Sequence, residues 1–373
     1  MRVIFTCGGT AGHVNPALAL AGLLKERDSR TEILFVGAKR GMEKQLIERA
    51  GYPFRAVNVS SFHRSFKWKE LRHNLVSAKN LITAPHEADA ILRDFRPDLA
   101  VGTGGYASYP IIRQAAKRGI PTAVHESNAL PGLTTELLEP YADCIMVGFE
   151  TCRQHYKHPE KIVVTGTPVR GDFFRLTKQE AKRALGVDDG RPLVVSFWGS
   201  LGATSMNRQM AEYLSLEAEK EPFHHIHSVG SIGWSRMEGW VKEHGVELKA
   251  HPSLDVREYI YDMATVMRAA DLVLSRAGAS TISELTALGV PAILVPSPNV
   301  TNNHQEKNAQ VLADAGGAVL LRESESSGKQ LFALSAAILK DPARQAEMSR
   351  AMLSLGVPQA AELICETVLS LRK

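Results

Sequence analysis

The segment 3–16 reads VIFTCGGTAGHVNP, and the order of its features decides the fold. Its first four residues are apolar or β-branched and predict a buried strand, and a glycine-rich loop follows them. Asn15 and Pro16 then predict the start of a helix, because asparagine caps helices and proline is tolerated in the first turn. A strand that runs through a glycine loop into a helix is the opening unit of a parallel α/β sheet.

The same alternation continues along the chain. Short apolar runs separated by longer segments of helical period predict parallel strands joined by crossover helices. The expected strands lie near residues 3–6, 33–36, 99–101, 122–125, 144–147 and 162–164, and then near 193–197, 224–228, 272–275, 292–295 and 318–321. A turn-rich stretch around Gly166 separates the two series.

The length of the chain supports a division into two domains. It has 373 residues, and single cores stop growing at roughly 250–300 residues. We predict an α/β protein with two Rossmann-like domains, 1–165 and 166–350, whose parallel sheets face a deep cleft. We expect a C-terminal helix in 351–373 to return toward the first domain.

Composition excludes several classes of protein. The four cysteines lack C-x-x-C spacing, so neither a disulfide framework nor a zinc site is expected. The start of the chain lacks the layout of a signal peptide, and no apolar run approaches the ~20 residues that span a bilayer, which predicts a soluble cytoplasmic protein. A net charge of +4 gives no support for nucleic-acid binding.

In parallel sheets ligands gather beyond the carboxyl ends of the strands. The glycine spacing in 8–12 is not the dinucleotide fingerprint G-x-G-x-x-G, which disfavours a nicotinamide enzyme and leaves an anion-binding loop or a tight turn. His13 lies at the exit of this loop, where an imidazole is able to take a proton from a hydroxyl group. A histidine that only hydrogen-bonds the loop fits equally well. Segments 102–106 and 125–128 follow two further strands and should open on the same edge.

Three polar segments follow strands in the second half. Segment 197–203 precedes a helix and suits a diphosphate through Ser200 and loop amides. Segment 275–284 carries Arg276 for a diphosphate and Glu284 for ribose hydroxyls, although Thr281-x-x-Glu284 also fits a capping box. Segment 296–308 is rich in amide side chains, which donate to and accept from sugar hydroxyls.

At these residues the chain resembles the MurG family of UDP-N-acetylglucosamine transferases, in glycosyltransferase family 28, along essentially its whole length. The most specific matches are 276–284, 291–298 and 302–309, which are similar to the Gram-positive form of the donor site. Segments 8–13, 104–106, 125–128 and 168–170 add independent matches.

The resemblance implies a GT-B fold and an inverting transfer without a cofactor or a protein-bound metal. Its donor would be UDP-N-acetylglucosamine and its acceptor lipid I, giving lipid II for peptidoglycan at the inner face of the cell membrane. The donor contacts that it implies are Thr10, Gly12, Asn128, Arg170, Ser200, Ile260, Met263, Ala279, Ser280, Thr281, Glu284, His304 and Gln305. On the acceptor side it implies His13, also the candidate base, together with Gly104, Tyr106, Glu126 and Asn128.

Several positions depart from the family pattern. They are Ala11, Thr135, Thr167, Trp198 and Leu201. These departures keep open a nucleotide-sugar binder with altered specificity or lost catalysis. A UDP-sugar epimerase of similar two-domain architecture is a further alternative, which would act without an acceptor.

Segment Phe62–Arg72 mixes aromatic and basic residues ahead of a helix that includes Leu75 and Ile82. Aromatic side chains enter the lipid interface while lysine and arginine meet anionic headgroups. An ordinary solvated basic face is the alternative. Together with the resemblance, the pattern favours peripheral contact with anionic phospholipid.

Overall fold

The computed structural model describes residues 1–9, 11–39, 41, 43–59 and 83–372. Thr10, the segment Phe62–Arg72 and most of the helix expected after it lie outside the described residues.

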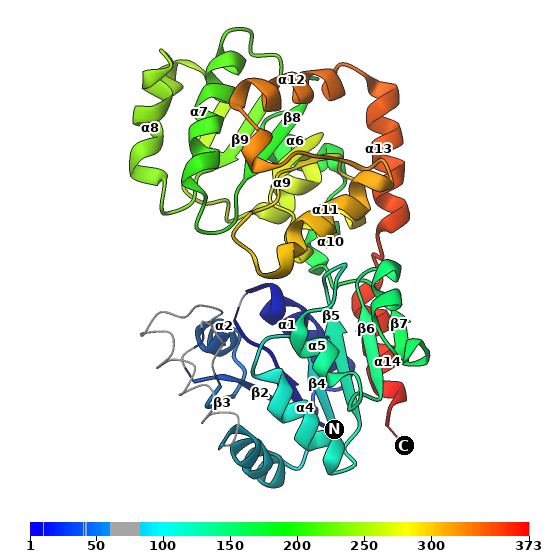
Figure 1. The fold of residues 1–373 in the computed structure, drawn as a ribbon. Helices are drawn as coiled ribbons and strands as arrows, with labels where there is room; N and C mark the ends of the chain where they lie inside the picture. The colour runs from blue at the N-terminus through cyan, green and yellow to red at the C-terminus, as the bar shows by residue number, and fades with distance from the viewer. Residues whose placement is uncertain (10, 40, 42, 60–82, 373) are drawn as a thin grey trace. The chain divides into compact units, whose positions relative to one another are not determined.

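The chain divides into two compact units. Unit 1 comprises Met1–Val169 and Pro358–Lys373, and unit 2 comprises Arg170–Val357 (Figure 1). The sequence places the domain border at 165/166 and the end of the second domain at 350. Unit 2 extends to Val357 because helix α13 (Pro342–Leu355) packs against another helix of that unit, α10 (Ala279–Leu288).

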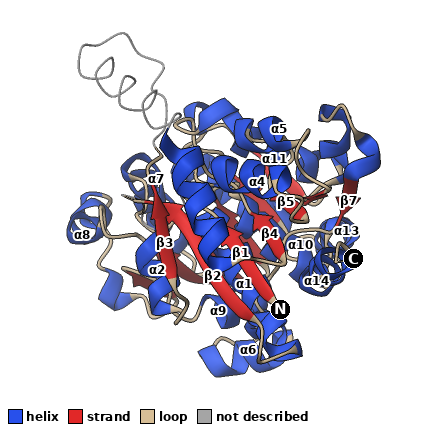
Figure 2. Cartoon of the chain, turned by 90° about the horizontal axis from the view of Figure 1, so that it is seen from below, coloured by secondary structure: helices blue, strands red, loops and turns tan. Residues whose placement is uncertain are grey.

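Unit 1 is built on a parallel sheet of seven strands in the order β3-β2-β1-β4-β5-β6-β7 (Figure 2). The strands are β1 (Arg2–Thr6), β2 (Glu32–Ala38), β3 (Phe54–Val57), β4 (Leu99–Gly102), β5 (Thr122–Glu126), β6 (Cys144–Val147) and β7 (Ile162–Val164). The helices are α1 (Ala11–Arg27), α2 (Glu43–Arg49), residues 83–95, α4 (Ser108–Lys117), α5 (Leu133–Leu138) and α14 (Ala360–Ser370).

Successive side chains of β1 enter two different hydrophobic cores of unit 1. Val3 and Phe5 belong to a core that includes residues of α1 and α14, whereas Ile4 belongs to a core that includes α4. Successive side chains of a strand point to opposite faces, so helices cover both faces of this sheet. The last helix, α14, packs on α1, the first one (Figure 1).

Unit 2 repeats this plan with a parallel sheet of six strands, in the order β10-β9-β8-β11-β12-β13. The strands are β8 (Leu193–Phe197), β9 (His224–Ser228), β10 (Leu254–Arg257), β11 (Leu272–Ser275), β12 (Ala292–Leu294) and β13 (Ala318–Leu320). The remaining helices are α6 (Lys178–Leu185), α7 (Thr204–Ala218), α8 (Trp234–Glu243), α9 (Met263–Ala269), α11 (His304–Asp314) and α12 (Gly328–Leu339).

Every strand expected from the sequence is present, but two strands were missed and one helix start was wrong. Both missed strands, β3 and β10, lie at sheet edges and carry charged residues, so they lack the apolar signal of a central strand. Helix α1 begins at Ala11, which places Pro16 inside the helix rather than in its first turn. Its early start is held by tertiary contact, because the Thr103 hydroxyl donates to the His13 carbonyl at 2.6 Å.

One stretch, Pro342–Ser370, passes a test of length and hydropathy for a membrane span, with a mean hydropathy of 1.2. The stretch is divided between α13 and α14, which belong to different units. Met348 of α13 lies in the core of unit 2, and Ile364 and Val368 of α14 lie in a core of unit 1. This stretch is therefore weak support for a span.

A buried polar chain crosses the core of unit 2. Burial raises the pKa of Glu217 well above its ordinary value and lowers the pKa of both His225 and His227 to about 3. All three groups are therefore neutral. The Glu217 carboxyl donates to His225 Nδ1 at 2.6 Å, and His225 Nε2–H donates to Ser196 Oγ at 2.8 Å. His227 Nδ1–H donates to the Ser196 carbonyl oxygen at 3.2 Å and lies 2.7 Å from the Ser196 hydroxyl oxygen.

We expect the free energy of unfolding of unit 2 to vary little between pH 5 and 6.5 and to fall above pH 6.5. Below the ordinary histidine pKa of 6.5 the unfolded chain gains two protons that the folded histidines refuse, and this loss of stability on acidification offsets the gain from the buried carboxyls of Glu217 and Glu284. Above pH 6.5 the histidines are neutral in both states, and the unfolded chain has released the Glu217 proton that the folded unit keeps, so stability falls. Urea unfolding from pH 5 to 8 checks this by tryptophan fluorescence, since three of the four tryptophans lie in unit 2.

Glu217→Gln is the matched variant for this experiment. Its amide still donates to His225 but has no proton to lose, so the difference between wild type and variant should narrow as the pH rises above 6.5. A constant difference between pH 6.5 and 8 would contradict a neutral Glu217.

Candidate functional site

Two glycine loops of unit 1 touch backbone to backbone at the carboxyl ends of β1 and β4. A Cβ atom on Gly105 would lie 2.3 Å from the Gly8 carbonyl oxygen, and Gly105 has a φ of +83°. Both the space and the backbone conformation therefore require glycine. The sequence predicted that these loops share one edge of the sheet, and the structure brings them into contact.

His13 is held in this contact. Its ring lies against Gly104, where a Cβ atom would be 2.7 Å from His13 Cδ2. Nδ1 lies 2.7 Å from the Gly8 carbonyl oxygen, which accepts hydrogen bonds only, so Nδ1 carries the proton. In a neutral imidazole this leaves Nε2 as the proton acceptor. The two interpretations of His13 are thus compatible: one nitrogen bonds the loop and the other is available as a base.

Glu126 organises the loop after β5. One carboxylate oxygen accepts from the Asn128 backbone N–H at 3.0 Å and its side-chain amide at 2.9 Å. The other accepts from the Gly132 N–H and the Thr135 hydroxyl, both at 2.8 Å. Glu126 is buried, so it shapes the loop rather than presenting a free carboxylate. Thr135, a departure from the family pattern, is explained as a donor to this carboxylate.

A second pair of glycines joins two loops of unit 2. A Cβ atom on Gly202 would lie 2.0 Å from the Val229 carbonyl oxygen, and one on Gly230 would lie 2.3 Å from the Gly202 nitrogen. The Asn207 side chain also donates to the Val229 carbonyl at 2.8 Å. This contact fixes the loop that carries exposed Ser200 ahead of α7.

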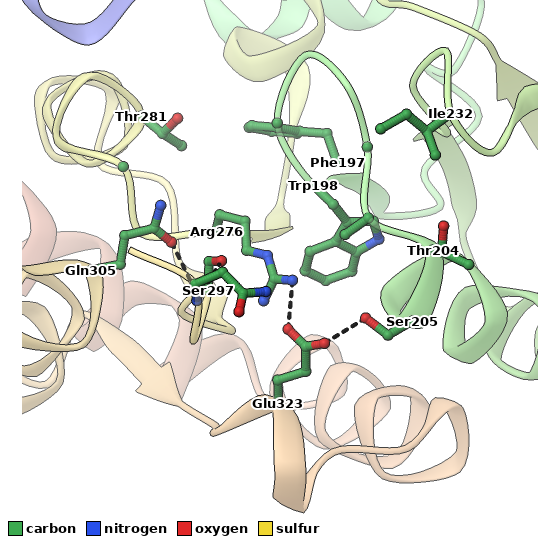
Figure 3. Close-up of a pocket in the computed structure, with 15 residues that line it drawn as sticks. Phe197, Trp198, Thr204, Ser205, Ile232, Arg276, Thr281, Ser297, Gln305 and Glu323 are labelled. Atoms are coloured by element: carbon green, nitrogen blue, oxygen red, sulfur yellow. Dashed lines mark hydrogen bonds and ion pairs between the residues drawn. The ribbon is translucent and has the colours of Figure 1, made fainter. Parts of the chain in front are cut away.

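Arg276 connects four loops of unit 2 (Figure 3). Its guanidinium donates to the carbonyl oxygens of Val295 at 3.0 Å and Pro296 at 3.1 Å, and it pairs with Glu323 at 2.5 Å. It also lies over the Trp198 ring, 5.9 Å from the centroid. These partners make Arg276 a structural connector.

Arg170 is the more accessible cation of the two. Its side chain is 59% exposed, against 11% for Arg276. Asp172 pairs with it at 3.3 Å, and its guanidinium lies over the Phe173 ring. A charge at the surface meets a ligand without breaking a buried network, so Arg170 is the better candidate for a diphosphate.

A pocket of about 540 Å³ opens beside Arg276 (Figure 3). Thr204 and Ser205 of α7 line it, as do Gly278 and Thr281 at the start of α10. Helix starts present free N–H groups and partial positive charge, so the pocket suits a phosphate group. Gln305 fixes the opposite wall by accepting from the Ser297 N–H at 2.9 Å.

Glu284 does not form the capping box that its spacing allows. Helix α10 has Gly278 as its N-cap, which places Glu284 beyond the first turn. Among the described residues none donates a hydrogen bond to its carboxyl group. Burial raises its pKa to about 7, opposed by the charge of Arg170 and assisted by that of Asp172. A partly buried carboxyl without a protein partner is available to ligand hydroxyls.

The other predicted donor residues of unit 2 lie on neighbouring loops. Ala279 and Ser280 begin α10, and His304 and Gln305 begin α11. The Ser280 hydroxyl is buried without a hydrogen-bond partner in the described structure. Ile260 is buried just before α9, which begins at Met263. Gly12 and Asn128 belong to unit 1, together with Gly104 and half-exposed Tyr106.

Sequence reasoning missed Glu323 and the role of Trp198. Trp198 occupies a glycine position of the family motif, yet it is 3% exposed and packs in the core of unit 2. Glu323 lies in a polar stretch whose composition gives no signal, and it bonds Ser205 as well as Arg276. Leu201 is 62% exposed, and no contact explains its identity. The described residues contain no group of three or more metal-ligating side chains.

Solved structures share this fold. Acinetobacter baumannii MurG matches with a TM-score of 0.78 at 24% identity, over 99% of each chain. The UDP-GlcNAc 2-epimerase of Neisseria meningitidis, bound to UDP-GlcNAc, matches with a TM-score of 0.64 at 16% identity, over 99% of this chain and 100% of that one. At these identities the likeness concerns the fold, which is GT-B.

Sequence comparisons identify the family. The model of the glycosyltransferase family 28 N-terminal domain matches residues 3–147, and that of the C-terminal domain matches 193–364. A UDP-N-acetylglucosamine–N-acetylmuramyl-(pentapeptide) pyrophosphoryl-undecaprenol N-acetylglucosamine transferase of Acetivibrio thermocellus is 40% identical over 100% of this chain and 99% of its own. The enzyme of the same description from Listeria monocytogenes is 38% identical over the whole of both chains. The chain therefore belongs to glycosyltransferase family 28, in the group of these MurG-type N-acetylglucosamine transferases.

Proposed function

We propose that this protein transfers N-acetylglucosamine from UDP-N-acetylglucosamine to the N-acetylmuramyl-pentapeptide that undecaprenyl pyrophosphate carries, with inversion at the sugar carbon. Relatives that match the full length of the chain are named for this reaction. The single structural observation that carries the proposal is the free carboxyl of Glu284 in unit 2, on the same helix as Thr281 of the pocket. Together they offer an acceptor for ribose hydroxyls and donors for phosphate oxygens.

Unit 2 would bind the donor nucleotide. The diphosphate enters the pocket between the first turns of α7 and α10, near Ser200, while the uracil lies against the backbone before α9. Negative charge that develops on the leaving UDP is stabilised by helix-terminal N–H groups and by Arg170. The proposed reaction uses these groups in place of a metal ion. Gln305 and His304 face the sugar in this arrangement.

Unit 1 would supply the base. The acceptor hydroxyl oxygen forms a bond to the sugar C1, and the bond from C1 to the diphosphate oxygen breaks with its electron pair left on UDP. The hydroxyl proton passes to His13 Nε2, which the Gly8 contact leaves as the basic nitrogen. Such proton transfer contributes about 10²–10⁴-fold to a rate.

The acceptor of the relatives is an undecaprenol derivative, so we infer that the protein works at the inner face of the cell membrane. The basic and aromatic residues of Phe62–Arg72 would contact anionic phospholipid there. The support for this part of the proposal comes from sequence alone, since the segment lies outside the described residues.

Transfer of labelled N-acetylglucosamine to a short-chain analogue of the lipid acceptor tests the function. The proposal requires product that depends on both substrates. Incubation with UDP-N-acetylglucosamine alone tests the epimerase alternative, which requires an epimer to form without acceptor. Folded protein that binds UDP but yields neither product would support a binder without catalysis.

Glu284→Gln should weaken UDP binding about 10- to 100-fold, because a hydrogen bond to a charged group contributes roughly 1.5–3 kcal/mol. The variant should be no less stable than wild type at pH 8. Burial raises the Glu284 pKa to about 7 from an ordinary 4.5, so the folded protein loses stability as the pH rises through that range. Calorimetric titration with UDP and urea unfolding at pH 8 measure the two effects. Glu238→Gln, at an exposed position of α8, is the control. Unchanged UDP affinity would refute the ribose assignment.

His13→Ala should lower the rate of transfer about 10²–10⁴-fold and leave UDP affinity within twofold of wild type, because His13 belongs to unit 1. Steady-state transfer kinetics and UDP titration measure these quantities separately. His155→Ala changes an exposed histidine of the same unit and serves as control. A large loss of UDP affinity would instead assign His13 to the donor.

A further inference from the structure

A buried carboxylate lies beneath the glycine loop that holds His13. Glu43 is the first residue of α2, and its side chain is 0% exposed. One carboxylate oxygen accepts from the Ala38 N–H at 2.7 Å, and the other accepts from the Gly9 N–H at 3.4 Å. Neither the family resemblance nor the proposed mechanism uses this residue.

The Gly9 N–H and the Gly8 carbonyl belong to one peptide group. Its N–H faces the Glu43 carboxylate, and its carbonyl oxygen accepts from His13 Nδ1 at 2.7 Å. A continuous chain therefore runs from the carboxylate through a single peptide unit to the imidazole. Hydrogen bonds linked in this way polarise one another, so a negative charge at the N–H end makes the carbonyl a stronger acceptor.

Glycines make room for this arrangement. A Cβ atom on Gly37 would lie 2.7 Å from the Glu43 side chain, and one on Gly8 would lie 3.0 Å from its carboxylate. The carboxylate is thus enclosed by backbone, which fixes its position relative to the Gly8–Gly9 peptide. Gly9 itself has a φ of +85°, which turns its N–H toward Glu43.

Few other titratable groups lie near the hydrogen bonds that link Glu43 to His13. Burial, and then the charge of Glu43, raises the pKa of Cys7 to about 12, so this thiol is neutral. The 102–108 segment that packs on His13 contributes Tyr106 and no ionic side chain. Within the described part of this loop cluster, Glu43 is the one carboxylate in contact with the peptide that holds His13.

We propose that Glu43 is a positioning residue for the transfer reaction and acts on His13 through the Gly8–Gly9 peptide. This inference rests on the proposed function, in which His13 Nε2 takes the proton of the acceptor hydroxyl. The carboxylate strengthens the hydrogen bond from His13 Nδ1–H to the Gly8 carbonyl and so stabilises the imidazolium that forms when Nε2 is protonated. It does what the carboxylate of a catalytic triad does for its histidine, with a peptide group placed between them.

Glu43→Gln tests this chain because the amide keeps the shape of the side chain but has one acceptor oxygen for two N–H groups. The shorter bond, to Ala38, keeps that oxygen, and Gly9 then faces an NH₂ group. In NMR spectra of wild type, the His13 Nδ1–H proton should resonate far downfield because its hydrogen bond to the Gly8 carbonyl is strong, and in the variant this resonance should move upfield while the proton stays on Nδ1. We expect the rate of transfer to fall about tenfold and UDP affinity to stay within twofold.

A double-mutant cycle with His13→Ala separates this role from a structural one. If Glu43 acts through His13, Glu43→Gln should lower the rate in wild type but not in the His13→Ala background. Glu48→Gln, on the exposed face of the same helix, is the control. Equal loss of rate in both backgrounds, or an unchanged His13 Nδ1–H resonance in the variant, would overturn the proposal.

The proposal stays testable if the protein shows no transfer activity or if Glu43→Gln does not fold. The NMR measurement needs no substrate, so a protein without transfer activity would still show whether Glu43 strengthens the hydrogen bond at His13 Nδ1. If Glu43→Gln does not fold, Glu43→Asp takes its place in the cycle. The aspartate side chain is one methylene shorter, so its carboxylate should reach the N–H of Ala38 or of Gly9 but not both. The loss of transfer rate should again depend on the presence of His13. If Glu43→Asp lowered the transfer rate equally with and without His13, that result would also overturn the proposal.

Discussion

Direct contact between loop backbones, at positions with no room for a side chain, is the constraint on which both halves of the molecule depend. In unit 1 the Gly8 carbonyl meets Gly105, and in unit 2 Gly202 meets the loop around Gly230. Each contact joins the ends of two neighbouring parallel strands, where a ligand is to be bound. A methyl group at any of these places would separate the loops and move His13 or Ser200 with them. The glycines therefore set the positions of the side chains that take part in the proposed reaction.

The charged groups of unit 2 fall into two kinds. Arg276 is saturated by carbonyl oxygens, an aromatic ring and Glu323, so its charge is used within the fold. Glu284 has the opposite character, because burial disfavours its ionised form and no described residue donates a hydrogen bond to it. A group that the fold leaves without a partner is one that a ligand is able to satisfy. The two residues are near in sequence, and their surroundings decide which charge is used within the fold and which is available to a ligand.

The sequence predicted the central strands well because they are buried on both faces and read as continuous apolar runs. It failed at β3 and β10, where Arg55 and Asp255 interrupt the pattern on edge strands. Motifs located the loops of the candidate site but did not assign every role within them. Thr281 and Glu284 have the spacing of a capping box, yet the helix starts at another residue. Glu43 gave no signal, since a carboxylate at a helix start is usually solvated, and its burial follows from glycines on other segments.

The return of the chain to unit 1 has a consequence for its biosynthesis. Ile364, Cys365 and Val368 complete an apolar core that also includes α1, Ile47 of α2 and residues of β1, β2, β4, β5 and β6. A ribosome makes the whole of unit 2 before these residues emerge, so the nascent N-terminal half waits with one flank uncovered while its neighbour is already able to fold. During that interval the exposed flank of α1 is a natural target for chaperones, and premature termination after Val357 would leave it permanently open to aggregation.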